Sequence, residues 1–202
     1  MKLLKGLFYA VLALLAAVLV VGLFLPKSAH VERSIATTAA PEAVYGIVSG
    51  FKRFNEWSPW SDLDLNTRYT YAGPESGVGA KMAWASDKPD VGAGSQEITA
   101  VEPGRSVTTK LDFGSQVIAT STLTITPEGS GSRIVWAFDA DFTGNFLGRY
   151  FGLMFDKFIG KDYEKGLARL KALAETAPAV AAQPVEPSTP TGQETPGPPR
   201  PQ

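Results

Sequence analysis

The chain has 202 residues, a length that allows one or two domains. Its 19 basic and 20 acidic residues nearly cancel, and no lysine and arginine cluster forms a stripe, which argues against a nucleic-acid partner. The chain has no cysteine, which excludes disulfide bonds and cysteine-based catalysis.

The first element is an uninterrupted apolar run, residues 7–25, flanked by lysines. As a helix, this run is long enough to cross a hydrocarbon core of about 30 Å. A cleaved signal peptide is the alternative, but its apolar stretch normally has about 7–15 residues and ends at a small-x-small site. After this run the best candidate site is Lys27-Ser28-Ala29, with a lysine where a small residue is needed. We therefore expect an uncleaved membrane anchor in residues 1–29.

Positive charges flank the apolar run on both sides, with Lys2, Lys5 and the terminal amine before it and Lys27 and Arg33 after it. By the positive-inside rule this distribution slightly favours an N-terminus on the inner side. The sequence therefore predicts a single-pass membrane protein whose domain lies on the outer side.

The C-terminal tail, residues 177–202, holds eight of the 15 prolines and almost no large apolar residue. Such a composition buries too little surface to offset the entropy of ordering, so we expect a disordered, Pro-rich tail. It could be a spacer or a docking peptide for an unknown protein partner. Residues 30–176 remain as one domain of ordinary size.

The domain begins with a predicted strand over residues 31–37, where apolar and polar residues alternate. Pro41 then opens a short helix, since proline is favoured in the first helical turn. Residues 51–57 predict a second short helix, which Pro59 ends.

From residue 67 onward the apolar pattern changes to a period of two. Breaks that contain Gly, Pro or Asp separate runs at residues 68–71, 81–84, 97–100, 110–113, 117–125 and 133–142. Short strands at this spacing predict an antiparallel meander.

The last element runs from Asn145 to Ala174 and carries apolar residues at steps of three and four. This period predicts an amphipathic helix, although Gly148 and Gly152 weaken its first half. A loop up to Phe155 with a shorter helix after it is the alternative. The order of elements predicts an α+β fold in which a curved antiparallel sheet grips a long C-terminal helix.

Strand alternation assigns the side chains of the sheet to two faces. The charged set faces outward: Lys81, Glu97, Lys110, Asp112, Arg133, Asp139 and Asp141. The apolar set faces the helix: Met82, Trp84, Ile98, Ala100, Leu111, Phe113, Val117, Leu123, Ile125, Ile134, Trp136 and Phe138. The inward polar groups are few: Gln96, Thr109 and Ser121, with Tyr69 and Tyr71 if they share that parity.

Several stretches resemble one known superfamily: APEAVY at residues 40–45, FNEWSPW at residues 54–60, GPESGVGA at residues 73–80 and FDKFIGKDYEKGL at residues 155–167. They resemble the START-like helix-grip superfamily, in its polyketide cyclase/dehydrase-like SRPBCC branch. The last stretch is similar to a membrane-anchored bacterial branch. The resemblance implies an elongated cavity between sheet and helix that accepts apolar ligands, and a bacterial inner-membrane protein with its domain on the periplasmic side.

The chemistry that the residues permit is narrow. His30 is the sole histidine, so Cys-His and Ser-His-Asp arrangements and a common zinc site are out. Asp62 and Asp64 follow Trp60 in a predicted loop, where aspartate usually turns the chain. We therefore expect no catalytic residue, no metal and no cofactor, and we favour a binding protein over an enzyme.

The run FKRFNEWSPW, residues 51–60, places four large aromatic side chains in ten residues and indicates a core or a pocket wall. Together with the inward face of the sheet, it gives twelve candidate cavity residues: Trp57, Trp60, Tyr69, Tyr71, Met82, Trp84, Gln96, Leu111, Phe113, Trp136, Phe138 and Phe155. An apolar lining with a few hydrogen-bonding groups suits ligand binding. The alternative is that these side chains pack solidly.

The sequence thus predicts a membrane-tethered domain that binds or handles a hydrophobic small molecule or lipid. A cyclase-like enzyme is one alternative, which would hold a reactive chain in a folded shape with little acid-base chemistry, aided by Tyr69, Tyr71 or Gln96. A cell-envelope interaction module that docks through its Pro-rich tail is another.

Overall fold

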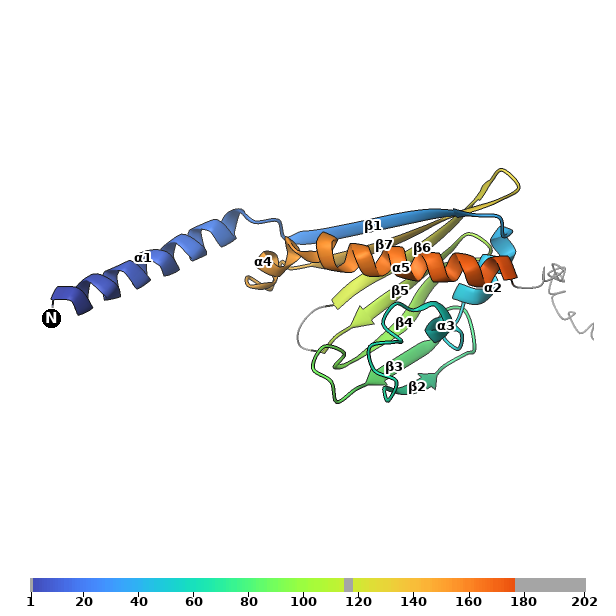
Figure 1. Ribbon diagram of the computed structural model, residues 1–202, viewed down its shortest axis with the longest axis horizontal. Coiled ribbons are helices and arrows are strands. Elements are labelled where there is room, and N and C mark those ends of the chain that lie inside the picture. Colours follow the sequence, from blue (N-terminus) through green and yellow to red (C-terminus); the bar gives the residue numbers. More distant parts are fainter. Residues whose placement is uncertain (1, 115–117, 177–202) are drawn as a thin grey trace, which may run out of the picture.

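The computed structural model describes residues 2–114 and 118–176 (Figure 1). The elements follow in the order α1 (Lys2–Phe24), β1 (Ser28–Thr37), α2 (Pro41–Val48), α3 (Phe54–Trp57), β2 (Arg68–Ala72), β3 (Lys81–Ala85), β4 (Ala93–Glu102), β5 (Ser106–Asp112), β6 (Ile118–Glu128), β7 (Gly131–Asp141), α4 (Gly148–Gly152) and α5 (Phe155–Thr176). The predicted tail, residues 177–202, and the inward position given to Val117 lie outside the described residues.

The seven strands form one antiparallel sheet in the order β1-β7-β6-β5-β4-β3-β2. Strands β2 to β7 form the expected meander, and β1 closes one edge by pairing with β7. Helix α5 runs along β1 on the concave face of the curved sheet, as Figure 1 shows. This arrangement is the helix-grip fold that the order of elements predicts. Strands β2 to β5 extend beyond the helix, and α3 with the loop after it lies over them.

The expected alternation of the strands is confirmed along β7. Trp136, Phe138 and Ala140 are buried against the helix side, whereas Asp139 and Asp141 are exposed. The two aspartates therefore face water and do not form a catalytic pair in a cavity. Lys81 and Glu97 form an ion pair of 3.0 Å across β3 and β4 on the outer face of the sheet.

The prediction that Ala100 faces inward is wrong. The register between β4 and β5 shifts at Ile98 and Ala100, where a β-bulge places an extra residue in β4. A bulge reverses the parity of all residues that follow it. Ala100 is consequently exposed, and Val101 packs against the core in its place.

The structure of the C-terminal segment is intermediate between the two predictions, a single long helix and a loop followed by a shorter helix. It forms two helices, α4 and α5, joined by a turn at residues 153–154. A Cβ atom at Gly148 would come within 2.7 Å of the Phe142 ring, and one at Gly152 within 2.8 Å. These glycines therefore allow α4 to pack closely on the end of β7. The predicted helix at residues 51–57 is also shorter than expected, since only Phe54–Trp57 is helical.

Arg33 fixes the position of α5 on the sheet. Its Nη1 donates to Asp156 Oδ1 at 2.9 Å, and its Nε donates to Glu164 Oε1 at 2.8 Å. The guanidinium passes beneath the helix at Gly160, where any Cβ atom would collide with it. An arginine on the inward face of β1 thus ties the first turns of α5 to the edge of the sheet.

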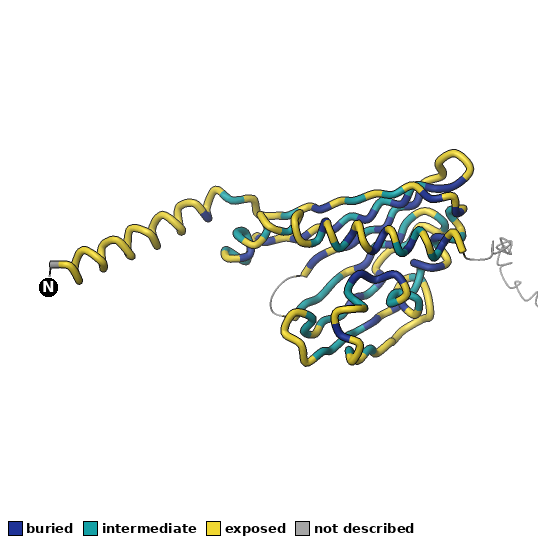
Figure 2. The backbone as a smooth tube through the Cα atoms, viewed as in Figure 1, coloured by how far each residue is buried: buried dark blue, intermediate teal, exposed yellow. Residues whose placement is uncertain are grey.

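Helix α1 projects from the domain, contacts it only near its C-terminal end and is exposed along almost its whole length (Figure 2). Its stretch Leu3–Phe24 is long and apolar enough to cross a membrane, by length and composition. The residues predicted as an anchor therefore form a helix, as those of a membrane span or of a signal sequence do. Residues 25–27 join it to β1.

Candidate functional site

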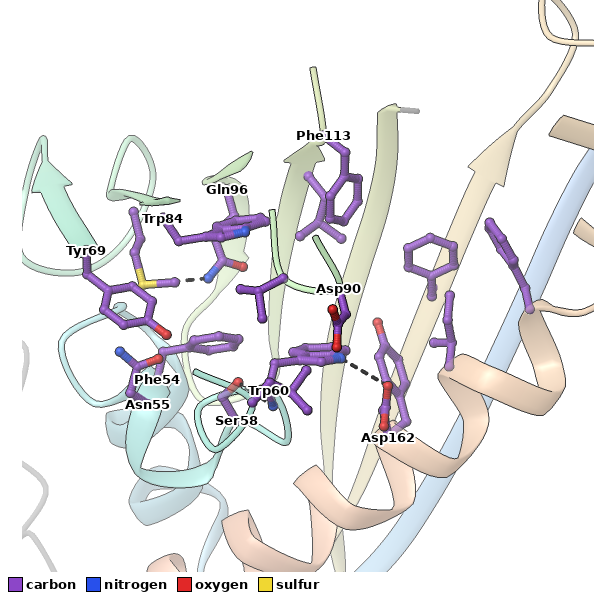
Figure 3. A pocket seen from close by; sticks show the side chains of 18 residues that line it. Phe54, Asn55, Ser58, Trp60, Tyr69, Trp84, Asp90, Gln96, Phe113 and Asp162 are labelled. Carbon is purple, nitrogen blue, oxygen red and sulfur yellow. Dashed lines mark hydrogen bonds between the residues drawn. The ribbon is translucent and has the colours of Figure 1, made fainter. Parts of the chain in front are cut away.

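A cavity of about 390 Å³ lies between the concave face of strands β2 to β5 and the first turns of α5. Helix α3 and the loop that follows it close the third side (Figure 3). The cavity is lined by Phe54, Asn55, Ser58, Trp60, Leu63, Tyr69, Met82, Trp84, Asp90, Val91, Gln96, Leu111, Phe113, Phe138, Phe155, Ile159, Asp162 and Tyr163. Most of these side chains are apolar or aromatic, which is the usual composition of a small-molecule site.

The sheet wall follows directly from strand register. Tyr69 pairs with Trp84, Met82 with Gln96, and Gln96 with Leu111. Residues directly opposite in an antiparallel sheet share a face, so these side chains all point to the same side. Because they belong to four neighbouring strands, they form a continuous wall.

The helix wall follows from the period of α5. Phe155, Ile159 and Tyr163 recur at steps of four and lie on one face of the helix. Phe155 contacts Phe138 of β7 edge to face, with 5.8 Å between ring centres. Helix and sheet therefore meet at this pair, which bounds one end of the cavity.

Tyr163 is a rigid part of the wall. Its ring stacks on Trp136 with 3.7 Å between ring centres and 7° between planes. Ser121 Oγ accepts a hydrogen bond of 2.7 Å from Trp136 Nε1 and lies 3.3 Å from the Tyr163 hydroxyl. Burial raises the pKa of the Tyr163 hydroxyl, so the group stays neutral. It can donate or accept a hydrogen bond but is not a base near neutral pH.

Trp60 closes the cavity from the loop side. Its Nε1 donates to Asp162 Oδ2 at 3.0 Å, as the dashed line in Figure 3 shows. This bond joins the loop after α3 to helix α5. The Trp60 ring also meets Trp136 and Tyr163 edge to face, at 5.9 and 6.3 Å between ring centres. Trp60 thus lines the cavity and also holds the loop after α3 against helix α5.

Two further aspartates fasten the same loop, and the predicted turn role is seen at Asp64, whose Oδ1 accepts from the backbone of Asn66. Asp62 pairs with Arg169 and, at 3.2 Å, with Lys165, both on α5. Asp64 is buried; it accepts a 2.5 Å hydrogen bond from Ser86 Oγ and one from the backbone of Asn66. Neither carboxylate lines the cavity. Their role is to hold the covering loop against the helix and the sheet.

The polar groups at the cavity are few and differ in kind. Gln96 is buried, and its side-chain amide has only a weak contact of 4.0 Å to Met82 Sδ among the hydrogen bonds of the described residues. Tyr69, Gln96 and Asn55 carry neutral donors and acceptors, whereas Asp90 and Asp162 carry carboxylates (Figure 3). The site can therefore orient one polar end of a mostly apolar molecule.

His30 is remote from this site. It lies on β1, and its Nδ1 is 2.7 Å from the exposed Asp139 Oδ1 on the outer face of the sheet. Within residues 2–114 and 118–176, no cluster of His, Asp or Glu side chains is placed to hold a metal ion.

The structure brings nine of the twelve candidate cavity residues to the cavity: Trp60, Tyr69, Met82, Trp84, Gln96, Leu111, Phe113, Phe138 and Phe155. Trp57 and Trp136 are instead buried behind the wall, where their rings meet edge to face at 5.2 Å. Tyr71 shares a face with Tyr69 but sits further along the edge strand β2 and is exposed. The ligand-binding role of all twelve remains a prediction.

Sequence reasoning missed nine lining residues: Phe54, Asn55, Ser58, Leu63, Asp90, Val91, Ile159, Asp162 and Tyr163. Ile159 and Tyr163 carried a signal, since they continue the apolar face of the helix that begins at Phe155. Asp90 and Val91 lie in the β3–β4 connection, and no periodicity marks a loop residue that folds over a cavity.

A family model described as "Polyketide cyclase / dehydrase and lipid transport" matches residues 28–175. Among curated proteins, no sequence matches this chain.

Solved structures of the same fold are numerous. A protein of Chromobacterium violaceum is similar over 75% of this chain and 100% of its own, with 17% identity and a TM-score of 0.53. Norcoclaurine synthase of Thalictrum flavum, crystallised as a point mutant with a transition-state analogue, is similar over 73% of this chain and 94% of its own, with 13% identity and a TM-score of 0.53.

The di-domain ARO/CYC protein StfQ, from the steffimycin biosynthetic pathway, shares 14% identity with a TM-score of 0.53. The similarity covers 74% of this chain and 51% of StfQ, so this chain spans about half of that protein. At such low identities these structures support the fold alone.

Proposed function

Because the chain belongs to the polyketide cyclase / dehydrase and lipid transport family, we propose that its domain binds a hydrophobic small molecule or lipid in the cavity between sheet and helix. One observation carries the proposal: the inward face of β2 to β5 is apolar but is not filled by α5, which leaves about 390 Å³ of space. A pocket of this size and composition suits a compact apolar ligand or part of an acyl chain.

The polar groups set the orientation of the ligand. Gln96 lies buried on the sheet wall with unused hydrogen-bonding capacity, and Tyr69 lies two strands away on the same wall. A polar group of the ligand bound there would pair with the Gln96 amide, whose one hydrogen-bond contact among the described residues is the weak one to Met82 Sδ. The apolar remainder would then extend along Leu111 and Phe113 toward Phe155.

Helix α1 supports a membrane location for this activity. Its stretch Leu3–Phe24 is apolar on all sides, and its large side chains are exposed, as expected for a helix that lipid surrounds. In our proposal α1 stays attached and tethers the domain to a bacterial inner membrane on the periplasmic side. A lipid-derived ligand would then be concentrated next to the cavity.

A cyclase-like reaction is the second candidate, and one observation favours it. Asp90, Asp162 and Tyr69 line the same cavity, so carboxylate and hydroxyl groups face any ligand bound there. Such groups could transfer protons while the walls hold a reactive chain in a folded shape. Turnover that falls on Asp162→Asn, with ligand affinity unchanged, would support this candidate over simple binding.

The binding proposal can be tested on residues 26–176, expressed without α1 and purified without detergent. Far-UV circular dichroism first checks that the fold survives removal of the helix. Native mass spectrometry followed by organic extraction then identifies any retained compound, and an apolar fluorescent probe measures affinity. We expect a discrete adduct and saturable binding of the probe.

Two variants locate the binding site. Leu111→Trp fills part of the cavity from the sheet wall and should lower probe affinity at least about tenfold, since the added ring occupies space that the probe needs. The same substitution at the exposed Leu65, outside the cavity, should leave affinity unchanged. Equal loss in both variants, or an unmodified mass with no probe binding, would contradict a cavity ligand.

A further inference from the structure

The segment from Phe146 to Phe158 carries an exposed apolar stripe that the domain leaves uncovered. Leu147, Phe151, Met154 and Phe158 are 46–65% exposed. They recur at steps of four, three and four through α4, the turn and the start of α5, which places them on one side of the segment. A contiguous exposed apolar patch of this kind marks an interaction surface.

The other side of the same segment is anchored in the domain. Gly148 and Gly152 pack against the Phe142 ring, while Phe155 and Ile159 line the cavity. The segment is therefore held in place by the fold, and its apolar stripe is fixed in the outward orientation. One side of this short segment therefore forms part of the cavity wall, and its other side carries the exposed stripe.

The segment also contacts the end of α1 (Figure 1). The Phe146 ring packs on Gly22, where any Cβ atom would collide with it. Arg149 Nη1 donates to the backbone oxygen of Gly22 at 3.2 Å, and the Tyr150 hydroxyl donates to the backbone oxygen of Val18. Val18 lies six residues before the end of α1, or about 9 Å along the helix axis. The segment therefore lies beside the last two turns of α1 and reaches back along the helix as far as Val18.

The connection between α1 and β1 is too short to separate the domain from the end of α1. Only residues 25–27 separate Phe24 of α1 from Ser28 of β1. The Cα atoms of these two residues can be at most about 15 Å apart, even in an extended chain. If α1 crosses a bilayer, the face of the domain that carries α4 must therefore lie at the bilayer surface.

We propose that residues 146–158 form a membrane-docking segment, whose apolar stripe is immersed in the bilayer interface beside the end of α1. The proposal rests on the membrane tether proposed above but not on the identity of the cavity ligand. Arg149 and Tyr150 place their polar ends on backbone oxygens of α1, and both residue types are suited to a membrane interface. Lys157 and Lys161 are exposed beside the stripe and can meet anionic headgroups.

Docking has a direct consequence for the cavity. Met154 and Phe158 face the lipid, while the neighbouring Phe155 and Ile159 face the cavity. One turn of helix then separates the hydrocarbon edge from the ligand site. A lipid-derived molecule bound in the cavity would then lie one helix turn from the bilayer.

The full chain has no cysteine, so single spin labels can report on depth without a background signal. Labels at Leu14, Phe151, Phe158 and Leu65, each introduced as cysteine, are compared in vesicles of phosphatidylcholine and phosphatidylglycerol. Leu14 lies within α1, and Leu65 is an exposed leucine on the loop between α3 and β2, away from α1. Power saturation measures collision with oxygen, which enriches in lipid, and with a nickel chelate, which stays in water.

We expect the oxygen-to-nickel ratio at Phe151 and Phe158 to be several-fold above that at Leu65 and below that at Leu14. In a second measurement, Phe151→Glu should lower the ratio at a Met154 label several-fold, whereas the matched Leu65→Glu should leave it unchanged. Water-like ratios at Phe151 and Phe158, with Leu14 in lipid, would overturn docking while the tether stands.

Two other outcomes also overturn the proposal. Labels at Phe151 and Phe158 that neither reagent reaches would show that a protein partner or a second copy covers the stripe. A Leu14 label in water would refute the tether and docking together. Ligand binding by residues 26–176 is measured separately and is unaffected by either result.

Discussion

The concave face of the sheet is filled on one side and hollow on the other. Over β7 and β6 the helix packs solidly, with Trp136 stacked on Tyr163 and Ile134 fully buried. Over β3 to β5, Trp84 and Leu111 remain half-buried and face open space. Both sides carry the same alternation of apolar and polar residues, so alternation alone does not distinguish a core from a cavity.

The difference arises from where the covering elements lie. Helix α5 lies along the β1 edge, where Arg33 pairs with Asp156 and Glu164 and where the buried apolar face of the helix packs on the sheet. The remaining strands are covered by a loop that Trp60 and Asp62 fasten to α5. This loop does not fill the space beneath it, which stays open as the cavity.

The largest difference in stability should be between two variants, one that removes a tryptophan from the filled side of the sheet and one that removes a tryptophan from the hollow side. Trp136→Ala leaves a void in close-packed surroundings and should lower the free energy of unfolding by about 3–5 kcal/mol. Trp84→Ala enlarges an existing cavity, so we expect a loss of less than about 2 kcal/mol together with weaker probe binding. Urea denaturation of residues 26–176, followed by far-UV circular dichroism, measures both. Equal losses of stability would contradict the division into filled and hollow sides.

The second-largest effect should come from removing the Ser121 hydroxyl, which lies behind the cavity wall. Ser121→Ala leaves the buried Trp136 Nε1 without the acceptor that it now has at 2.7 Å, which should cost about 1–3 kcal/mol. Thr122→Ala, on the outer face of the same strand, should change stability by less than about 0.5 kcal/mol. The same denaturation measurement compares the two, and a neutral Ser121→Ala would show that the wall relaxes or admits water.

Two helical glycines test how closely α5 fits. At Gly166 a Cβ atom would lie 2.7 Å from Trp136 and 3.1 Å from Pro59, so Gly166→Ala should destabilise the domain by about 1–3 kcal/mol. At Gly46 of α2 nothing lies within 4 Å of such an atom, and Gly46→Ala should stabilise by about 0.5–1 kcal/mol through helix propensity. Thermal unfolding measures whether each variant is more or less stable than the wild type. A change in the same direction for both variants would refute the close fit of α5 at Gly166.

The smallest effect concerns pH and the loop over the hollow side. Hydrogen bonds from Arg169 and then Lys165 lower the pKa of Asp62 below its ordinary 3.8. A carboxyl with a lowered folded-state pKa contributes stability above its unfolded-state pKa, and that contribution is lost as pH falls through the folded-state pKa. Unfolding free energy should therefore fall less steeply below about pH 4 in Asp62→Asn than in the wild type. Identical acid limbs in a pH series would show that this ion pair contributes nothing to stability.

The sequence by itself determined the α+β fold and most of the sheet wall. Period-two runs identified the strands, and parity placed Met82, Trp84 and Leu111 on the inward face without any structure. This works because backbone geometry sends alternate side chains to opposite faces regardless of what covers them. The motifs from FNEWSPW to FDKFIGKDYEKGL likewise indicated the family to which the chain belongs.

Only the tertiary structure decided what covers each face. Trp57 and Trp136 are predicted at the cavity but lie in the core, because α3 places the Trp57 ring against Trp136, and Tyr163 of α5 stacks on Trp136. A bulge after Ile98 turned Ala100 outward, and its position depends on pairing with β5. Asp162 and Asp90 reach the cavity only because a helix and a loop, distant in sequence, fold over the same strands. Local patterns fix the direction of a side chain, whereas its neighbours depend on long-range packing.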